Sequence, residues 1–270
     1  MTLDLNLGGK TALVTGSSGG IGLVIAKMFA AEGARVIVHG RHRDALEEAL
    51  EQLRASGAEV ALVAGDVTLD GDAQHIAEGA TAAFGTVDIL VNNAGAYINR
   101  AFDEMSPSDW LATYDTNLVS SVRLTKLLAP SMRERGWGRL IQIATLEARQ
   151  PLDVMGDYSA AKAAMLTLTV HLSKVFARTG VTSNAVSPGI IVTDAVKTFF
   201  NKMASDRKWP VSGWDEIAAY VAQTAYPIPA GRLGAPQDVA DLVAYLASPR
   251  AGFVDGANLM VDGGLIGTVG

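Results

Sequence analysis

Short and nearly continuous apolar runs recur along this chain of 270 residues, and stretches with helical periodicity separate them. A strand that helices cover on both sides is apolar along its whole length, whereas a half-exposed strand alternates. The pattern therefore predicts an α/β fold with one doubly wound sheet of about seven parallel strands and helices on both faces. The runs occupy residues 11–15, 34–40, 59–66, 87–95, 138–145, 181–189 and 257–264.

Residues 44–57 show what separates the runs. Their apolar side chains recur every three or four positions, as on the buried face of a helix. These side chains are Ala45, Leu46, Ala49, Leu50 and Leu53. Asp44 and Glu47 have the spacing of a capping box, and Gly57 is placed to end the helix. Strand, helix and strand at this spacing predict parallel neighbours, whose ligands bind beyond the carboxyl ends of the strands.

Residues 1–270 are expected to form a single domain, because no internal repeat, low-complexity tract or linker divides them. One segment, residues 195–230, lacks a strand pattern, and prolines and a glycine interrupt its two short helical pieces. It is rich in aromatic residues, namely Phe199, Phe200, Trp209, Trp214, Tyr220 and Tyr226. We expect a helical substrate lid there; the alternative is that the rings only fill a small core of the segment itself.

The composition argues against several classes of function. The formal net charge is −6 and Lys and Arg form no cluster, so no nucleic acid is expected as a partner. The absence of cysteine rules out disulfide and thiolate chemistry and fits a reducing compartment. The histidines at 39, 42, 75 and 171 lack metal-ligand spacing, so no metal site is expected. The chain begins without a secretory-signal pattern, and no apolar run is long enough to span a membrane, so the expected location is cytoplasmic.

A glycine-rich stretch, TGSSGGIG at residues 15–22, begins at the last residue of the first apolar run and leads into an apolar helical segment. Glycine is needed where the backbone turns tightly out of a strand, and where a Cβ would keep a pyrophosphate from a helix N-terminus. Gly16, Gly20 and Gly22 lie between strand and helix, which is the context of a dinucleotide-binding site. The expected fold is therefore a Rossmann-type domain.

Four motifs extend this similarity over essentially the whole chain. They are Gly-x-x-x-Gly-x-Gly at residues 16–22, NNAG at 92–95, Tyr158-x-x-x-Lys162 and SPG at 187–189. The chain thereby resembles the short-chain dehydrogenase/reductase family. The resemblance implies an oxidoreductase that transfers a hydride between a nicotinamide cofactor and a small carbonyl or alcohol substrate, and that forms a homotetramer or homodimer.

The resemblance also assigns cofactor-binding positions. The glycine-rich loop contributes Gly16, Ser17, Ser18, Gly20, Ile21 and Gly22. Asp66 and Val67 are expected to hold the adenine, and the adenosine side is expected to meet Asn93, Ala94 and Gly95. Near the carboxamide we expect Pro188, Gly189, Ile191 and Thr193, and the set is completed by Tyr158 and Lys162.

The end of the second apolar run bears on the choice between the two nicotinamide cofactors. A carboxylate there accepts hydrogen bonds from the ribose hydroxyls and favours NAD, but residues 39–41 read HGR. Arg41 is expected to pair with a 2′-phosphate, so NADP(H) is expected in preference to NAD(H). Ser17, His42 and Arg43 are candidates to assist it. The alternative is an arginine that only solvates the loop.

Tyr158 and Lys162 stand four residues apart, which places both on one face of a helix. Because a nearby ammonium favours ionised tyrosine, Lys162 is expected to lower the pKa of Tyr158 below its ordinary value of about 10. Tyr158 then protonates the carbonyl oxygen in reduction, or accepts the proton in oxidation. The resemblance implies that Lys162 also bonds the nicotinamide ribose and that Asn117 holds a water in a proton relay. The alternative for Asn117 is an ordinary polar residue on a helix.

A threonine stands where the family has its catalytic serine. That position is about thirteen residues before Tyr158, and here it is Thr145. Threonine keeps the hydroxyl donor for the substrate oxygen and adds one methyl group, which stiffens the first side-chain torsion. We therefore expect Thr145 to orient the substrate; the alternative is a β-branched residue that merely ends a strand.

Two further side chains lie near the expected substrate, Tyr97 after NNAG and Glu147 after Thr145. A carboxylate at position 147 favours a cationic or hydroxylated substrate, or disfavours an acidic one. The alternative is a solvated loop charge, paired with Arg149.

The leading hypothesis is an NADP(H)-dependent carbonyl reductase or alcohol dehydrogenase. Within that class, a 3-oxoacyl-thioester reductase and a sugar or steroid dehydrogenase are the alternatives. A non-catalytic NADP-binding protein is an alternative of another class, although such a protein has little reason to keep Tyr158, Lys162 and Asn117 together.

Overall fold

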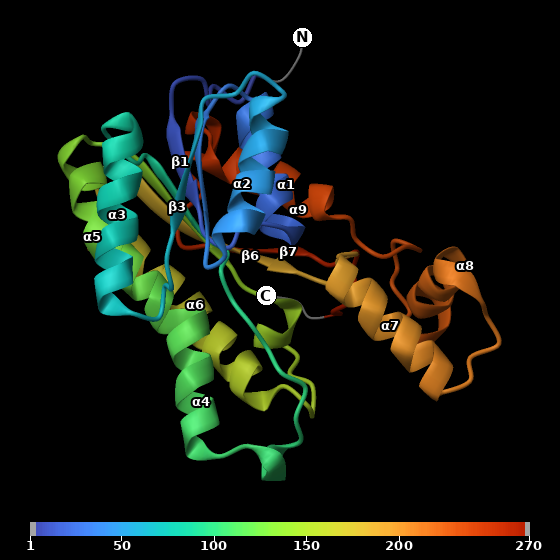
Figure 1. Ribbon diagram of the computed structural model, residues 1–270. Helices are drawn as coiled ribbons and strands as arrows, with labels where there is room; N and C mark the ends of the chain where they lie inside the picture. Colours follow the sequence, from blue (N-terminus) through green and yellow to red (C-terminus); the bar gives the residue numbers. More distant parts are fainter. Residues whose placement is uncertain (1–3, 268–270) are drawn as a thin grey trace.

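All seven apolar runs form strands of one parallel sheet in the computed structural model, which describes residues 4–267 (Figure 1). Residues 1–3 and 268–270 of the predicted domain lie outside this range. The strands are β1 (Thr11–Val14), β2 (Arg35–Gly40), β3 (Val60–Ala64), β4 (Ile89–Asn92), β5 (Gly138–Ile143), β6 (Val181–Pro188) and β7 (Asn258–Val261), in the order β3-β2-β1-β4-β5-β6-β7. The prediction of a Rossmann-type doubly wound sheet is confirmed.

Helices cover both faces of the sheet (Figure 1). On one face lie α1 (Gly20–Ala31), α2 (Arg43–Arg54) and α9 (Pro236–Ala247); on the other lie α3 (Asp70–Phe84), α5 (Ser120–Glu134) and α6 (Gly156–Val175). Successive strand residues enter opposite cores, because Leu13 joins the α3 and α5 side whereas Val14 joins the α1 and α9 side. This arrangement explains why the strands are apolar at every position. Along residues 4–267, none of the helices combines the length and apolar character that crossing a bilayer requires.

The chain reverses its direction across the sheet between β1 and β4. From β1 it proceeds outward to β2 and β3, and it then returns to the other side of β1 to build β4 to β7. In doubly wound sheets, ligands bind at this reversal, beyond the carboxyl ends of the strands. The loop after β1 and the NNAG motif at the end of β4 therefore meet at the predicted cofactor site.

The start of α2 differs from the sequence prediction. The helix begins at Arg43, and His42 is its N-cap with no side-chain hydrogen bond. Asp44 therefore lies inside the first turn, so the predicted capping box of Asp44 and Glu47 is wrong. Glu47 instead pairs with Arg43, one helical turn away, at 2.8 Å. Gly57 does adopt the left-handed conformation expected near a helix end, with φ of +82°.

The segment after β6 forms α7 (Asp194–Asp206), α8 (Gly213–Tyr220) and a π-helical turn (Val221–Ala225), and it stands out from the sheet (Figure 1). Its buried side chains are Phe200, Ala204, Ile217, Val221, Ala222, Ile228 and Leu233, which pack on one another. The ring centroids of Trp209 and Tyr220 lie 4.7 Å apart. The aromatic residues thus fill a core of the segment, while Phe199 remains partly exposed.

Candidate active site

The loop between β1 and α1 depends on glycine at three positions. Gly16 and Gly20 have φ of +64° and +56°, in the left-handed region that residues with a Cβ disfavour. A Cβ at Gly22 would lie 2.4 Å from the carbonyl oxygen of Gly16 and 2.5 Å from Asn93 Nδ2. The first turn of α1, which includes Ile21, therefore packs directly on the loop. Its free N–H groups make a site that favours an anion.

Asn93 fixes this loop from the side of β4. Its Nδ2 donates to the carbonyl oxygens of Thr15, at 2.8 Å, and Gly16, at 3.1 Å. The backbone N–H groups of Asn93 and Ala94 both donate to the Thr15 hydroxyl at 2.9 Å. Thr15, which the sequence analysis did not single out, thus links the end of β1 to the end of β4, the two strands that flank the chain reversal.

Ser17 is turned into the protein. Its hydroxyl is fully buried, donates to the carbonyl oxygen of Val14 at 2.7 Å and accepts from the His39 N–H at 3.0 Å. The expected help of the Ser17 hydroxyl in binding a 2′-phosphate is therefore wrong, because both of its bonds hold β1 against β2. Ser18 is the serine that faces the end of β2, since a Cβ on Gly40 would lie 3.3 Å from Ser18 Oγ.

His39 is a buried structural residue of the cofactor side that the sequence analysis did not identify. Its Nδ1 accepts from the Gly16 N–H at 3.3 Å, which leaves Nε2 to donate to the carbonyl oxygen of Gly65 at 3.2 Å. Burial lowers the pKa of His39 to about 4, so the ring is neutral at physiological pH. The available signal was a histidine at the carboxyl end of the apolar run, directly after Val36, Ile37 and Val38.

Arg41 and Asp66 lie near each other at the ends of β2 and β3. Two hydrogen bonds from Thr68 to Asp66 Oδ1, at 2.9 and 2.7 Å, and to a lesser extent the charge of Arg41, lower the pKa of Asp66. Arg41 is exposed, whereas Arg43 forms its ion pair with Glu47. Val67 is buried behind Asp66. Within residues 4–267, Arg41 thus forms no ion pair with a carboxylate on α2, in contrast to Arg43.

Tyr158 and Lys162 lie on one face of α6, and Thr145 follows β5 opposite them. The hydroxyl groups of Thr145 and Tyr158 share a hydrogen bond. Lys162 is buried, donates from Nζ to the carbonyl oxygen of Ile143 at 2.8 Å, and lies 5.7 Å from the centroid of the Tyr158 ring. Ala144 is buried in a small apolar cluster, as expected for a packing residue.

The pKa of Tyr158 is raised, not lowered. Burial is the main cause, the charge of Glu147 and the phenol of Tyr97 add to it, and the bond to Thr145 opposes it. Burial also lowers the pKa of Lys162 to about 8. The expected effect of Lys162 on Tyr158 is therefore outweighed by loss of water around both groups. A tyrosine that keeps its proton at neutral pH suits a proton donor.

Asn117 lies in a π-helical turn (Asp115–Val119) that joins α4 (Pro107–Tyr114) to α5. Its Nδ2 donates to the carbonyl oxygens of Ala96, at 2.7 Å, and Thr113, at 3.0 Å, while Oδ1 accepts from the Ala96 N–H at 3.2 Å. A Cβ on Gly95 would lie 2.7 Å from Asn117 Oδ1 and 3.4 Å from Lys162 Nζ. Glycine at 95 therefore lets Asn117 and Lys162 converge on the end of the NNAG motif.

Glu147 lies in a short 3₁₀ turn (Leu146–Ala148) directly after Thr145. Burial raises its pKa to about 7, and its charge in turn raises the pKa of both Tyr97 and Tyr158. The rings of Tyr97 and Tyr158 pack with centroids 5.5 Å apart. Glu147 and Tyr97 thus belong to the surroundings of Tyr158, and the alternative of a fully solvated loop charge does not fit the burial of Glu147.

Replacing Glu147 with glutamine is expected to stabilise the protein more at pH 8.5 than at pH 5. A carboxyl group whose folded-state pKa is raised contributes full stability below its unfolded pKa, and that contribution is lost as pH rises through about 7. The difference in free energy of unfolding between variant and wild type should change by about 1 to 3 kcal/mol between the two pH values, after allowance for partial solvent screening. Urea unfolding at both pH values measures it. Glu51→Gln, at an exposed carboxylate of α2, should show no such change.

The four residues expected near the carboxamide lie between the end of β6 and the start of α7, at the base of the segment of α7 and α8, where it joins the sheet. Pro188 ends β6, and a Cβ on Gly189 would lie 2.8 Å from the Asp262 Cα. Ile191 is buried and forms an isolated parallel bridge with Gly234. Thr193 is the N-cap of α7, where its hydroxyl accepts from the Val196 N–H at 3.3 Å.

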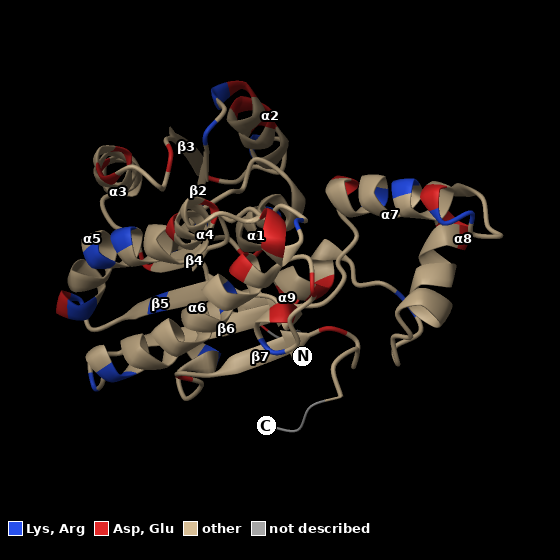
Figure 2. Cartoon of the chain, turned by 90° about the horizontal axis from the view of Figure 1, so that it is seen from below, with Lys and Arg blue, Asp and Glu red and all other residues tan. Residues whose placement is uncertain are grey.

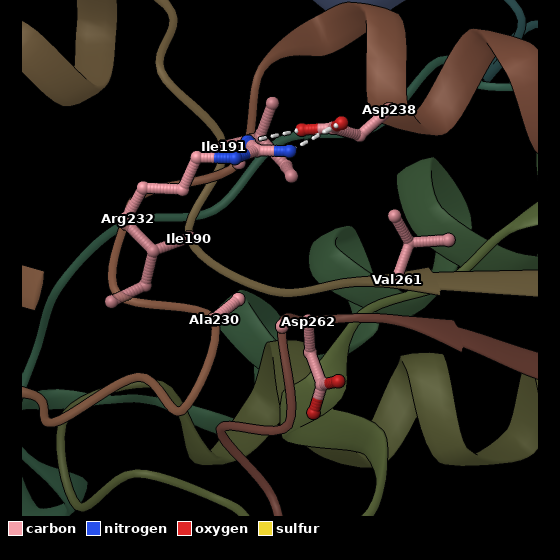
Figure 3. Close-up of a pocket in the computed structure, with 9 residues that line it drawn as sticks. Ile190, Ile191, Ala230, Arg232, Asp238, Val261 and Asp262 are labelled. Atoms are coloured by element: carbon pink, nitrogen blue, oxygen red, sulfur yellow. Dashed lines mark hydrogen bonds and ion pairs between the residues drawn. The ribbon is translucent and has the colours of Figure 1, made fainter.

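A cavity of about 160 Å³ lies at this base, between the loops after β6 and β7 (Figure 3). Ile190, Ile191, Ala230 and Val261 supply much of its apolar lining. Arg232 forms two hydrogen bonds with the Asp238 carboxylate, at 2.7 and 2.8 Å, across one side. The cavity was not expected from the sequence, because it joins segments that are far apart along the chain.

Comparisons with known proteins agree with this geometry. The family model for short chain dehydrogenase matches residues 10–204. A 3-oxoacyl-(acyl-carrier-protein) reductase of Vibrio cholerae is 35% identical, over 97% of this chain and 99% of its own. The structure is similar to that of L-sorbose reductase from Gluconobacter frateurii complexed with NADPH and L-sorbose, with a TM-score of 0.92, 34% identity, and coverage of 99% of this chain and 100% of that chain.

A 7α-hydroxysteroid dehydrogenase, complexed with NADH and 7-oxoglycochenodeoxycholic acid, is also similar, with a TM-score of 0.86, 32% identity and coverage of 98% of each chain. These three relatives differ in substrate, and the two solved structures differ in cofactor, so the common property of the three is the family and its redox chemistry. The chain belongs to the short chain dehydrogenase family and is an oxidoreductase.

Proposed function

We propose that this enzyme uses NADPH to reduce a carbonyl substrate, with Thr145, Tyr158, Lys162 and Asn117 as its catalytic residues. The observation that carries the proposal is that the Tyr158 phenol, the Thr145 hydroxyl and the buried ammonium of Lys162, whose Nζ lies 5.7 Å from the centroid of the Tyr158 ring, come together in the fold. Two hydroxyl donors that meet at one point form a site for a carbonyl oxygen.

The residues at the carboxyl ends of β1 and β4 fit a dinucleotide. A side chain at Gly22 would collide with the loop, so the loop backbone lies close to the N-terminus of α1, where a pyrophosphate binds well. The loop from Gly16 to Gly22 would hold the pyrophosphate, Asp66 and Val67 the adenine, and Asn93, Ala94 and Gly95 the adenosine side. Pro188, Gly189, Ile191 and Thr193 would border the carboxamide. When bound, the cofactor supplies the hydride.

The proton reaches the substrate oxygen from Tyr158. Thr145 donates a hydrogen bond to that oxygen and orients it, and Tyr158 holds its proton at neutral pH because burial raises its pKa. Lys162, with a pKa of about 8, is largely charged at pH 7 and stabilises the phenolate that remains. Asn117 is proposed to hold a water in a proton relay behind Lys162.

NADP(H) is proposed as the preferred cofactor because Arg41 is exposed at an end of β2 that carries no acid. Arg41→Ala is expected to raise the Kd for NADPH by about 10- to 100-fold, the effect of one charge-assisted bond to a phosphate. The Kd for NADH should stay within about twofold. Fluorescence titration with both cofactors measures the change.

Arg43→Ala is the matched control, because Arg43 pairs with Glu47 and should affect neither Kd by more than about twofold. Equal affinity of the wild type for NADH and NADPH would contradict the proposed preference.

The helical lid, the oligomer and the cytoplasmic location are parts of the same proposal. Phe199, partly exposed on α7, is the aromatic residue of the segment best placed to meet a ligand. A homotetramer or homodimer is supported by exposed apolar side chains on the long helices, namely Leu127 on α5 and Val170 and Val175 on α6. Analytical ultracentrifugation tests the assembly.

A 3-oxoacyl-thioester reductase is the second candidate, and the similarity to the Vibrio cholerae enzyme favours it. Docking of an acidic carrier protein requires a basic surface. Figure 2 shows Lys or Arg together with Asp or Glu on α7, and one of these lysines, Lys202, pairs with Asp206 at 2.8 Å. The charged residues of α8 are both acidic, Asp215 and Glu216. This mixture of charges argues for a small substrate.

The decisive experiment measures oxidation of NADPH and of NADH with a panel of ketones, aldehydes, ketoses, ketosteroids and 3-oxoacyl thioesters. The proposal expects turnover with at least one free carbonyl compound and a higher kcat/KM with NADPH. Tight binding of NADPH without turnover on any member would favour the alternative of a non-catalytic NADP-binding protein.

A further inference from the structure

One oxygen of the Glu147 carboxylate lacks a hydrogen-bond donor. Its Oε2 atom is buried and accepts no hydrogen bond from the described residues. A buried acceptor without a donor costs free energy, and the cost is larger for a charged group. Such a group in a native site requires an explanation, and a ligand that supplies the missing donor is one.

This carboxylate lies beside the reacting oxygen. The Thr145 hydroxyl accepts a hydrogen bond from the Glu147 N–H at 3.4 Å, and it also bonds to the Tyr158 hydroxyl. The charge of Glu147 acts on the phenols of both Tyr97 and Tyr158. A molecule held by Thr145 and Tyr158 therefore has Glu147 as its neighbour.

Ammonium and hydroxyl groups both donate to a carboxylate, and the site favours a hydroxyl. Lys162 already places an ammonium 5.7 Å from the centroid of the Tyr158 ring, so a cationic substrate group beside Tyr158 would be repelled. The pKa of Glu147, about 7, means that both of its protonation states are populated at neutral pH. A hydroxyl both donates and accepts, so it can pair with the carboxylate and also with the O–H of the protonated form. An ammonium only donates, and its bond weakens when the carboxylate loses its charge.

We infer that Glu147 determines substrate specificity by accepting a hydrogen bond from a substrate hydroxyl close to the reacting carbonyl, which makes polyhydroxylated ketones the substrate class. This inference rests on the proposed carbonyl reduction and adds the recognition of a second oxygen. Alkyl ketones and 3-oxoacyl thioesters carry no hydroxyl next to the carbonyl, and they would leave Glu147 Oε2 buried without a donor. Sites built around such a bond reject substrates that lack it strongly.

The test compares three ketones of equal chain length: butan-2-one, 3-hydroxybutan-2-one and 1,3,4-trihydroxybutan-2-one, each with NADPH. For the wild type, kcat/KM is expected to rise by at least about 100-fold from the first to the third. Glu147→Leu should lower kcat/KM for the triol by about 10- to 100-fold and leave butan-2-one unchanged or improved. Glu147→Gln keeps one acceptor and should lose about 3- to 10-fold on the triol alone.

Glu51→Gln is the matched control for removal of one negative charge and should match the wild type on all three ketones. Thermal unfolding and the Kd for NADPH show whether each variant is folded; if Glu147→Leu is not, the glutamine variant decides. Equal losses on all three ketones, or a wild type that does not discriminate among them, would overturn this inference and leave carbonyl reduction standing. No reduction of any ketone, here or in the wider panel, would overturn the proposed function together with the inference.

Discussion

Tyr158→Phe is expected to lower kcat for carbonyl reduction by about 10²- to 10⁴-fold, the range for loss of a general acid. Phenylalanine keeps the ring that packs on Tyr97 at 5.5 Å and removes only the hydroxyl that bonds to Thr145. Cofactor binding should therefore change by less than about threefold. Steady-state kinetics with saturating NADPH, together with fluorescence titration of the cofactor, separates the two effects.

Thr145 supplies the comparison for that result. Thr145→Ser keeps the hydroxyl and should stay within about threefold of wild-type kcat, whereas Thr145→Val keeps the shape and should lose about 10- to 100-fold. The ordering of the three variants is the test. Near wild-type turnover in Thr145→Val, beside an inactive Tyr158→Phe, would show that Thr145 does not orient the substrate.

Gly22→Ala is expected to raise the Kd for the cofactor by at least about 100-fold. The new Cβ would lie 2.4 Å from the Gly16 carbonyl oxygen, which is backbone and cannot rotate away. The loop or α1 must therefore move. We expect this to lower the free energy of unfolding by about 1 to 3 kcal/mol and to displace the groups that bind the cofactor. Fluorescence titration with NADPH and thermal unfolding measure the two consequences.

Gly19→Ala is the control within the same loop. Gly19 has an extended φ of −172°, and a Cβ there would meet nothing within 4 Å. This variant should bind NADPH within about threefold of wild type. If both alanine variants weakened binding equally, general stiffening of the loop would explain the result, and the close approach at Gly22 would not.

The sheet could be predicted from the sequence because each strand is buried on both sides. Leu13 and Val14 enter opposite cores, and this requirement produces a continuous apolar run. The short length of such runs and their β-branched residues distinguish them from buried helix segments. The start of α2 was not predictable in the same way. Asp44 and Glu47 have the right spacing for a cap. The helix nevertheless begins one residue earlier, at Arg43, which is a good helix former.

In the site, residue types and order were predictable, whereas the direction of each side chain was not. The adjacent Ser17 and Ser18 differ only in where the turn points them, and Ser17 is the one that is buried. The π-helical turn around Asn117 likewise packs against α6, and a contact between segments so far apart along the chain leaves no periodic signal. The raised pKa of Tyr158 follows from burial, which the four-residue spacing of Tyr158 and Lys162 does not encode.

The segment of α7 and α8 has a core of its own. Phe200, Ile217 and Val221 are buried against each other and not in either core of the sheet. The two ends of the segment meet where Ile191 forms a parallel bridge with Gly234. Because its packing is separate, substitutions inside this small core are expected to change turnover more than they change the unfolding temperature of the domain.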